Sequence, residues 1–214
     1  MCWAKELGHT KILLLGANGR TGRGILNLAL EAGDDVTAVV RSKDKLADID
    51  HPNLNVLAGD VCEPEALQQI LPGHDVVIST LGPRSPTKAA CRIYSDSAVA
   101  VVDSMQKCGI SRLLVVSTAL LFLSSKLLDR VLRFIARNNA HNASLMENTI
   151  LASKLEWTIA RVGFLNEKKS EEYRLAEGAL PEGSNSIPRA ALAHFLITEA
   201  KQSNHPCNIV GVSE

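Results

Sequence analysis

The sequence predicts an α/β fold of the doubly wound type, a mostly parallel sheet with helices on both faces. Apolar runs of strand length alternate with segments of helical periodicity, and a glycine-rich turn separates the first run from the first helix. Helices between successive strands imply right-handed crossovers and a sheet that is covered on both sides. No linker or repeat divides the 214 residues. We therefore expect one domain over 1–214, with the C-terminal third supplying the substrate pocket.

The first half of the chain gives the clearest alternation. Lys11 to Leu15 is an apolar run that ends in glycine, as a buried strand does, and a helical pattern then runs from Arg20 to Ala32 before Gly33. The following expected elements are strands at 35–40, 54–60, 75–80 and 112–118, a helix at 64–71 that starts with proline, and a helix around 94–105 that stops at Gly109.

The second half follows the same pattern less regularly. We expect helices at 126–137 and 141–155, a sixth strand at 156–162, a helix from Pro188 to Ala200 and a last strand at 207–212. The polar, glycine-punctuated stretch from Gly163 to Ser186 predicts at most a short hairpin within 172–183.

Composition excludes several function classes. Lysine plus arginine equals aspartate plus glutamate at 23 each, so no overall field attracts nucleic acid or an anionic membrane. The five cysteines, at 2, 62, 91, 108 and 207, suit neither a disulfide framework nor a metal knuckle, and the scattered histidines show no ligand spacing. The first residues lack the order of a signal peptide, and no apolar run has the ~20 residues of a membrane span. We expect a cytoplasmic protein, monomeric or a homodimer, that binds no metal.

The segment "GANGRTGRG" predicts a dinucleotide site. Gly16, Gly19 and Gly22 lie three apart between a predicted strand and a predicted helix. The first glycine allows the tight turn, the second allows phosphates to approach the backbone, and the third allows close packing of helix on sheet. The N-terminus of the helix then faces the pyrophosphate with free N–H groups and positive potential.

The end of the second predicted strand favours NADP(H) over NAD(H). NAD sites place a carboxylate here for the ribose 2′-hydroxyl, but this chain reads "VVRSKDK". Arg41, Ser42 and Lys45 instead offer cations and a hydroxyl, which suit a 2′-phosphate.

The motifs "GANGRTGRG", "VVRS", "LAGDV", "ISTLG", "VVSTA" and "EWTIARVGFL" occur in that order. The chain thereby resembles the atypical short-chain dehydrogenases with a single NAD(P)H-binding Rossmann domain, of the biliverdin reductase B (NADPH-flavin reductase) type, and their NmrA-like relatives. The resemblance covers nearly the whole chain and is more specific for fold and cofactor than for substrate.

That resemblance implies roles for particular residues. The pyrophosphate contacts would come from Gly16, Ala17, Asn18, Gly19, Arg20, Thr21 and Gly22, and the 2′-phosphate contacts from Arg41, Ser42 and Lys45. Asp60 and Val61 would flank the adenine, Thr80, Leu81 and Gly82 the ribose, and Gly163 and Phe164 the nicotinamide. Val162 replaces the proline that the family usually has before Gly163.

The catalytic residues are less evident. The wider short-chain dehydrogenase group uses a tyrosine with a lysine four residues later, but Ala98 and Glu177 stand four residues after Tyr94 and Tyr173. Ser117 and Thr118, at a strand end that the family places near the nicotinamide, are the candidate catalytic pair, with a structural capping role as the alternative.

The remaining polar candidates are weaker. His141 and Glu147, six apart on one predicted helix, do not share a face, so we expect both at the surface. Arg84, on the loop after the fourth strand, and Phe122, in the apolar segment "TALLFL", are candidate substrate contacts. The alternatives to a substrate-binding role for that segment are burial in the core and contact with a partner subunit.

Three hypotheses for function follow. A reductase that transfers hydride from NADPH to a small planar acceptor such as a flavin needs no acid–base pair, because positioning carries the chemistry. An NmrA-like NADP(H)-binding redox sensor without turnover is the alternative, favoured by the missing tyrosine and lysine. A sugar-nucleotide epimerase or dehydratase ranks last, because it needs that tyrosine and a larger substrate domain.

Overall fold

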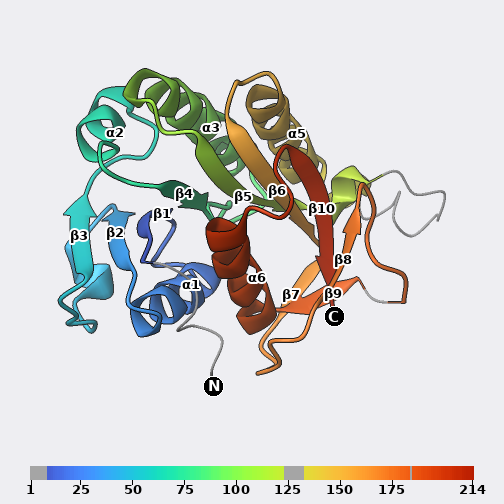
Figure 1. Cartoon of the computed structure of the whole chain (residues 1–214). Coiled ribbons are helices and arrows are strands. Elements are labelled where there is room, and N and C mark those ends of the chain that lie inside the picture. Colours follow the sequence, from blue (N-terminus) through green and yellow to red (C-terminus); the bar gives the residue numbers. More distant parts are fainter. Residues whose placement is uncertain (1–8, 123–132, 184) are drawn as a thin grey trace.

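A computed structural model describes residues 9–122, 133–183 and 185–214. They form an α/β sandwich with helices on both faces of a central sheet (Figure 1). The strands are β1 (Lys11–Leu15), β2 (Asp35–Val40), β3 (Leu54–Ala58), β4 (Val76–Ser79), β5 (Arg112–Thr118), β6 (Glu156–Val162), β7 (Phe164–Asn166), β8 (Arg174–Glu177), β9 (Ser186–Pro188) and β10 (Asn208–Ser213). The helices are α1 (Arg20–Glu31), α2 (Pro64–Ile70), α3 (Lys88–Cys108), α5 (Arg137–Leu151) and α6 (Arg189–Gln202), with short 3-10 turns η1 (Lys43–Leu46) and η2 (Ala119–Leu121).

The main sheet has eight strands in the order β3-β2-β1-β4-β5-β6-β10-β8. Every neighbouring pair is parallel except β10 with β8. The strand order reverses between β1 and β4, and ligands of open α/β sheets bind at such a point, outside the carboxyl ends of the strands. The predicted doubly wound α/β class is confirmed.

Two buried apolar clusters hold the layers together. Helices α1 and α6 pack on one face of the sheet, and α2, α3 and α5 pack on the other (Figure 1). The sheet strands β1, β4 and β5 are buried along nearly their whole length, because side chains on both faces meet a helix. The carboxyl ends of β1, β4 and β5 are thereby fixed in a rigid frame.

The C-terminal third departs from one expectation. The hairpin predicted within 172–183 does not form: β8 pairs antiparallel with β10, while β7 and β9 make a separate two-stranded parallel sheet. Short polar strands carry too little apolar pattern to specify a partner, so pairing with β10 decides the outcome and makes β8 the edge strand of the sheet. Gly211 permits the approach, since a Cβ there would lie 1.9 Å from the Ala179 carbonyl oxygen.

Helix α3 is longer at its N-terminal end than predicted. Helix α3 begins at Lys88, where the Thr87 hydroxyl accepts a hydrogen bond from the Ala90 N–H and caps it. The helix expected at 126–137 lies largely outside the described residues. Within the described ranges, no helix is long and apolar enough to cross a membrane.

Candidate functional site: a dinucleotide cradle beside a buried ion pair

The glycine turn between β1 and α1 has the geometry of a phosphate cradle. Gly16 adopts φ +87°, a conformation that residues with a side chain rarely adopt. The Gly19 N–H donates to the Gly16 carbonyl at 2.9 Å. A Cβ on Gly22 would lie 2.2 Å from the Gly16 carbonyl oxygen, so only glycine fits there. The turn therefore brings backbone directly against the N-terminus of α1, as a bound pyrophosphate requires.

The end of β4 closes the cradle from the other side. Thr80 donates its backbone N–H to the Leu15 carbonyl at 2.9 Å, and its Oγ1 would lie 2.8 Å from a Cβ on Gly16. Leu81 and Gly82 continue from it at the same edge and are half-buried and exposed, respectively. The glycine turn and the segment after β4 are therefore in contact where the strand order reverses.

The basic loop after β2 is held in place by an arginine that sequence reasoning missed. Arg23 of α1 donates to the Asp48 carboxylate at 2.6 and 3.0 Å and to the Lys45 carbonyl at 2.5 Å. The hydrogen bond with Arg23 lowers the pKa of Asp48, and that with Asp48 raises the pKa of Arg23. Arg41 and Lys45 remain exposed on a loop with a fixed backbone.

The adenine-flanking candidates lie on the loop after β3. Asp60 accepts a hydrogen bond from the Cys62 N–H at 2.9 Å, which forms a tight turn, and Val61 beside it is buried. The Gly59 N–H donates to the Val40 carbonyl at 3.0 Å, so this loop is tied to the end of β2. With the glycine turn and the basic loop, the residues present fit a dinucleotide.

The ends of β5 and β6 carry a buried polar cluster. Ser117 donates to Glu147 Oε1 at 2.5 Å, and Arg161 donates to both oxygens of the same carboxylate at 3.0 and 2.6 Å. Glu147 is only 2% exposed. The expectation of a surface position for Glu147 is wrong, because helix α5 turns this residue toward the sheet and Arg161 compensates its charge; His141 is exposed as expected.

The two hydroxyls at the end of β5 have different partners. The Ser117 hydroxyl donates a hydrogen bond to Glu147, whereas Thr118 Oγ1 accepts a hydrogen bond from the Leu120 N–H at 3.3 Å and caps η2. No described residue accepts a hydrogen bond from the Thr118 hydroxyl. The structural role therefore applies to both, but Thr118 can still donate to a ligand.

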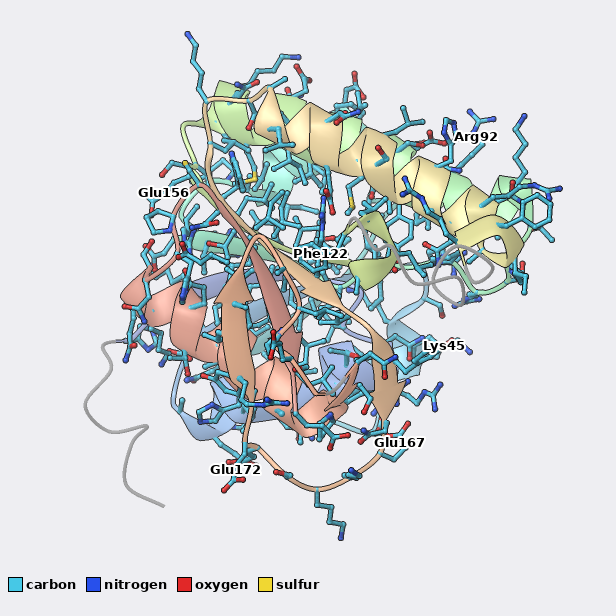
Figure 2. All side chains as sticks on the ribbon, turned by 90° about the vertical axis from the view of Figure 1, so that its right-hand side faces the viewer. Lys45, Arg92, Phe122, Glu156, Glu167 and Glu172 are labelled. Carbon is cyan, nitrogen blue, oxygen red and sulfur yellow. The ribbon has the colours of Figure 1, made fainter. Side chains whose placement is uncertain are left out.

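The apolar segment after β5 is half-buried. The Arg161 guanidinium lies over the Phe122 ring, with its carbon 4.7 Å from the ring centroid (Figure 2 labels Phe122). Residues 119–122 are neither fully buried core nor fully exposed. Phe122 is thus positioned by the ion pair through Arg161.

Three further candidates, Gly163, Phe164 and Arg84, lie near this edge. Gly163 lets the chain pass close to the neighbouring segment, because a Cβ there would lie 1.9 Å from the Asn185 carbonyl oxygen. The Phe164 N–H donates to the same carbonyl at 2.8 Å, and its side chain is 60% exposed. Arg84 is also exposed, on the loop that precedes α3.

Burial disfavours the deprotonated form of both tyrosines. Burial raises the pKa of Tyr94 to about 12, although its hydroxyl would lie 3.5 Å from a Cβ on Gly82. Tyr173 packs against α6, with its ring centroid 5.6 Å from that of Phe195, and burial raises its pKa as well.

Comparisons with known proteins agree with this geometry. The profile of a protein family described as NAD(P)H-binding matches residues 16–203. A short-chain dehydrogenase/reductase of Veillonella parvula, solved in complex with NADP, superimposes with a TM-score of 0.78 at 21% identity, covering 97% of this chain and 95% of that one. A Streptococcus pneumoniae protein whose name proposes an NADH-flavin reductase superimposes with a TM-score of 0.76 at 24% identity, covering 96% and 99%.

Two sequence relatives are 28% and 29% identical to this chain over the aligned residues. The photosystem II assembly factor Ycf39 of Synechocystis is 28% identical over 103 residues, which is 48% of this chain and 32% of the relative's length. An uncharacterized chloroplastic protein of Arabidopsis thaliana is 29% identical over 218 residues, covering 94% of this chain and 76% of that protein.

Proposed function

Because the chain belongs to the NAD(P)H-binding family, we propose that it is an NADPH-dependent reductase that transfers hydride to a small planar acceptor such as a flavin. One observation carries the proposal. Among the described residues at the carboxyl ends of β5 and β6, Glu147 and Arg161 neutralise each other in a buried pair, and the Thr118 hydroxyl has a proton that it can donate to a substrate. Such a site suits a reaction that needs positioning more than acid–base catalysis.

The basic loop supports NADPH over NADH. Arg41 and Lys45 follow β2 where a carboxylate would bind the ribose of NAD, and the clamp by Arg23 limits the entropy lost when they close on a phosphate. Asp44 accepts a hydrogen bond from Ser42 Oγ at 3.1 Å, which keeps that hydroxyl at the loop.

The residues around the nicotinamide position would orient the reaction. The bound reduced nicotinamide supplies the hydride. Thr118 would donate a hydrogen bond to the acceptor, while Phe122 supplies a flat apolar wall, and water supplies the proton that a reduced flavin takes up. Arg84, Gly163 and Phe164 border the same edge and are the further contacts that we propose.

The test follows NADPH oxidation at 340 nm with FMN, quinones and bilins as acceptors. Thr118→Val should lower kcat about tenfold, because it removes one hydrogen bond in the reacting complex. Ser117→Ala is the matched control: it should lower stability but leave NADPH affinity and hydride transfer nearly unchanged. Equal kcat for Thr118→Val and the wild type would overturn the assigned role of Thr118.

The cofactor preference has its own test. Arg41→Glu should weaken NADPH binding by about tenfold or more and leave NADH binding almost unchanged, because only NADPH carries the 2′-phosphate. Calorimetric titration of both cofactors measures this. An equal loss for both would refute the assignment of Arg41.

A redox sensor without turnover is the second candidate. The missing tyrosine–lysine pair favours it, as does similarity to relatives that are named assembly factors. Tight NADPH binding without oxidation by any acceptor would support this function against the reductase.

A further inference from the structure

Beside the glycine turn, one carboxylate joins two arginines that are far apart in sequence. Glu167 Oε1 accepts from Arg20 at 2.8 Å and from Arg189 at 2.5 Å. Arg20 is the first residue of α1, Arg189 is the first residue of α6, and Glu167 directly follows β7. In Figure 2, Glu167 lies on the same side of the view as Lys45 of the basic loop.

The placement of these arginines is unfavourable for the helices themselves. A cation at a helix N-terminus opposes the helix dipole, where an anion would stabilise it. Within their described first turns, neither α1 nor α6 has an acidic residue. Glu167 therefore supplies from outside the negative charge that both N-termini lack. Two guanidinium groups and one carboxylate still leave a net charge of +1 beside the cradle.

The two halves of this cluster differ in burial. Arg20 and Glu167 have side chains 73% and 62% exposed, and ion pairs between such groups contribute little. The Arg189 side chain is only 15% exposed, and it also donates to the Asn166 carbonyl at 3.4 Å. The bond from Arg20 is thus easily exchanged for another anion, whereas Arg189 keeps Glu167 where it is.

We propose that Glu167 is a built-in competitor of the cofactor's pyrophosphate for Arg20. Dinucleotide binding transfers Arg20 from Glu167 to the phosphates, and Glu167 stays on Arg189. The retained carboxylate limits cofactor affinity and favours release of the dinucleotide after use. This inference rests on the cofactor-binding part of the proposed function and not on turnover.

The test is calorimetric titration of the full chain with NADPH. Glu167→Gln should bind NADPH about three- to tenfold more tightly, because it removes the negative charge that competes with the diphosphate for Arg20. The gain should shrink when NaCl is raised from about 50 to about 500 mM, since the groups are exposed. Glu172→Gln, a neutralised carboxylate on the same exposed segment, is the matched control and should change the affinity less than twofold.

A double-mutant cycle separates exchange of Arg20 from a general field effect. Arg20→Gln should weaken NADPH binding, and Glu167→Gln should give little further gain in that background. An unchanged or weaker affinity for Glu167→Gln, or the full gain without Arg20, overturns the proposal. If the wild type bound neither NADPH nor NADH, the proposed function itself would fail and this proposal with it. Binding without turnover would remove only the reductase activity.

Discussion

Strands β5 and β6 carry a buried arginine–glutamate pair at each end, and the two pairs have different consequences. At the amino ends, Arg112 donates to Glu199 Oε1 at 2.7 Å, while Glu199 also accepts from the His205 N–H at 2.8 Å and contacts His205 Nδ1 at 2.9 Å. At the carboxyl ends, Arg161 and Glu147 form a bidentate pair.

The difference lies in what each pair borders. Glu199 lies on α6 and is 1% exposed, and its partners come from β5, β6 and the loop before β10, so the pair fastens α6 to the sheet. Glu147 also accepts from Ser117, and its partner Arg161 supports Phe122 beside the proposed site. The same chemistry therefore fastens a helix to the sheet at one edge and positions a side chain beside the proposed site at the other.

The largest expected effect is on stability, when the Arg112–Glu199 pair at the amino ends of the strands is broken. Arg112→Met should lower the free energy of unfolding by about 3–5 kcal/mol, because it leaves the Glu199 charge buried without its cation. NADPH affinity should be unchanged, since the cradle lies at the opposite edge. Urea unfolding and cofactor titration measure the two quantities. The matched control is Lys107→Met, which removes an exposed pair with Asp103 and should cost under about 1 kcal/mol.

The carboxyl-edge pair should respond differently. Glu147→Gln keeps the shape but removes the charge that binds Arg161, so we expect a loss of about 2–3 kcal/mol of stability. Because Phe122 is held through Arg161, the KM for the acceptor should also rise, which is not expected of Arg112→Met. If both variants altered stability alone, the assigned difference between the two edges would be wrong.

The smallest expected effect is the loss of stability at acidic pH that Glu199, of the Arg112–Glu199 pair, causes. Burial raises the pKa of Glu199, but the hydrogen bonds from His205 and the charge of Arg112 outweigh it, so the pKa lies below its ordinary value of 4.5. A carboxyl group whose pKa is lower in the folded state stabilises the protein at pH values above its ordinary pKa. This contribution is lost as the pH falls through the folded-state pKa.

Urea midpoints measured between about pH 6 and about pH 3.5 test this expectation. The wild type should lose more stability on acidification than Glu199→Gln, which has no carboxyl group to protonate at this position. Parallel curves for the two proteins would show that Glu199 does not contribute. Because Glu147 lies in a separate cluster, Glu147→Gln should retain the acid sensitivity that Glu199 causes.

The sequence by itself determined the layered α/β fold and the place of the cofactor cradle. Apolar runs such as 11–15 and 112–118 specify buried strands, and Gly16 and Gly22 are dictated by local backbone geometry, so short-range patterns suffice. The tertiary structure alone decided the partners of the charged residues that pair across different elements. Glu147 and Arg161 are 14 residues apart and Arg20 and Glu167 are 147 apart, and no periodicity encodes such pairings. These pairs form only when the packing of helices on the sheet brings groups of opposite charge close to each other.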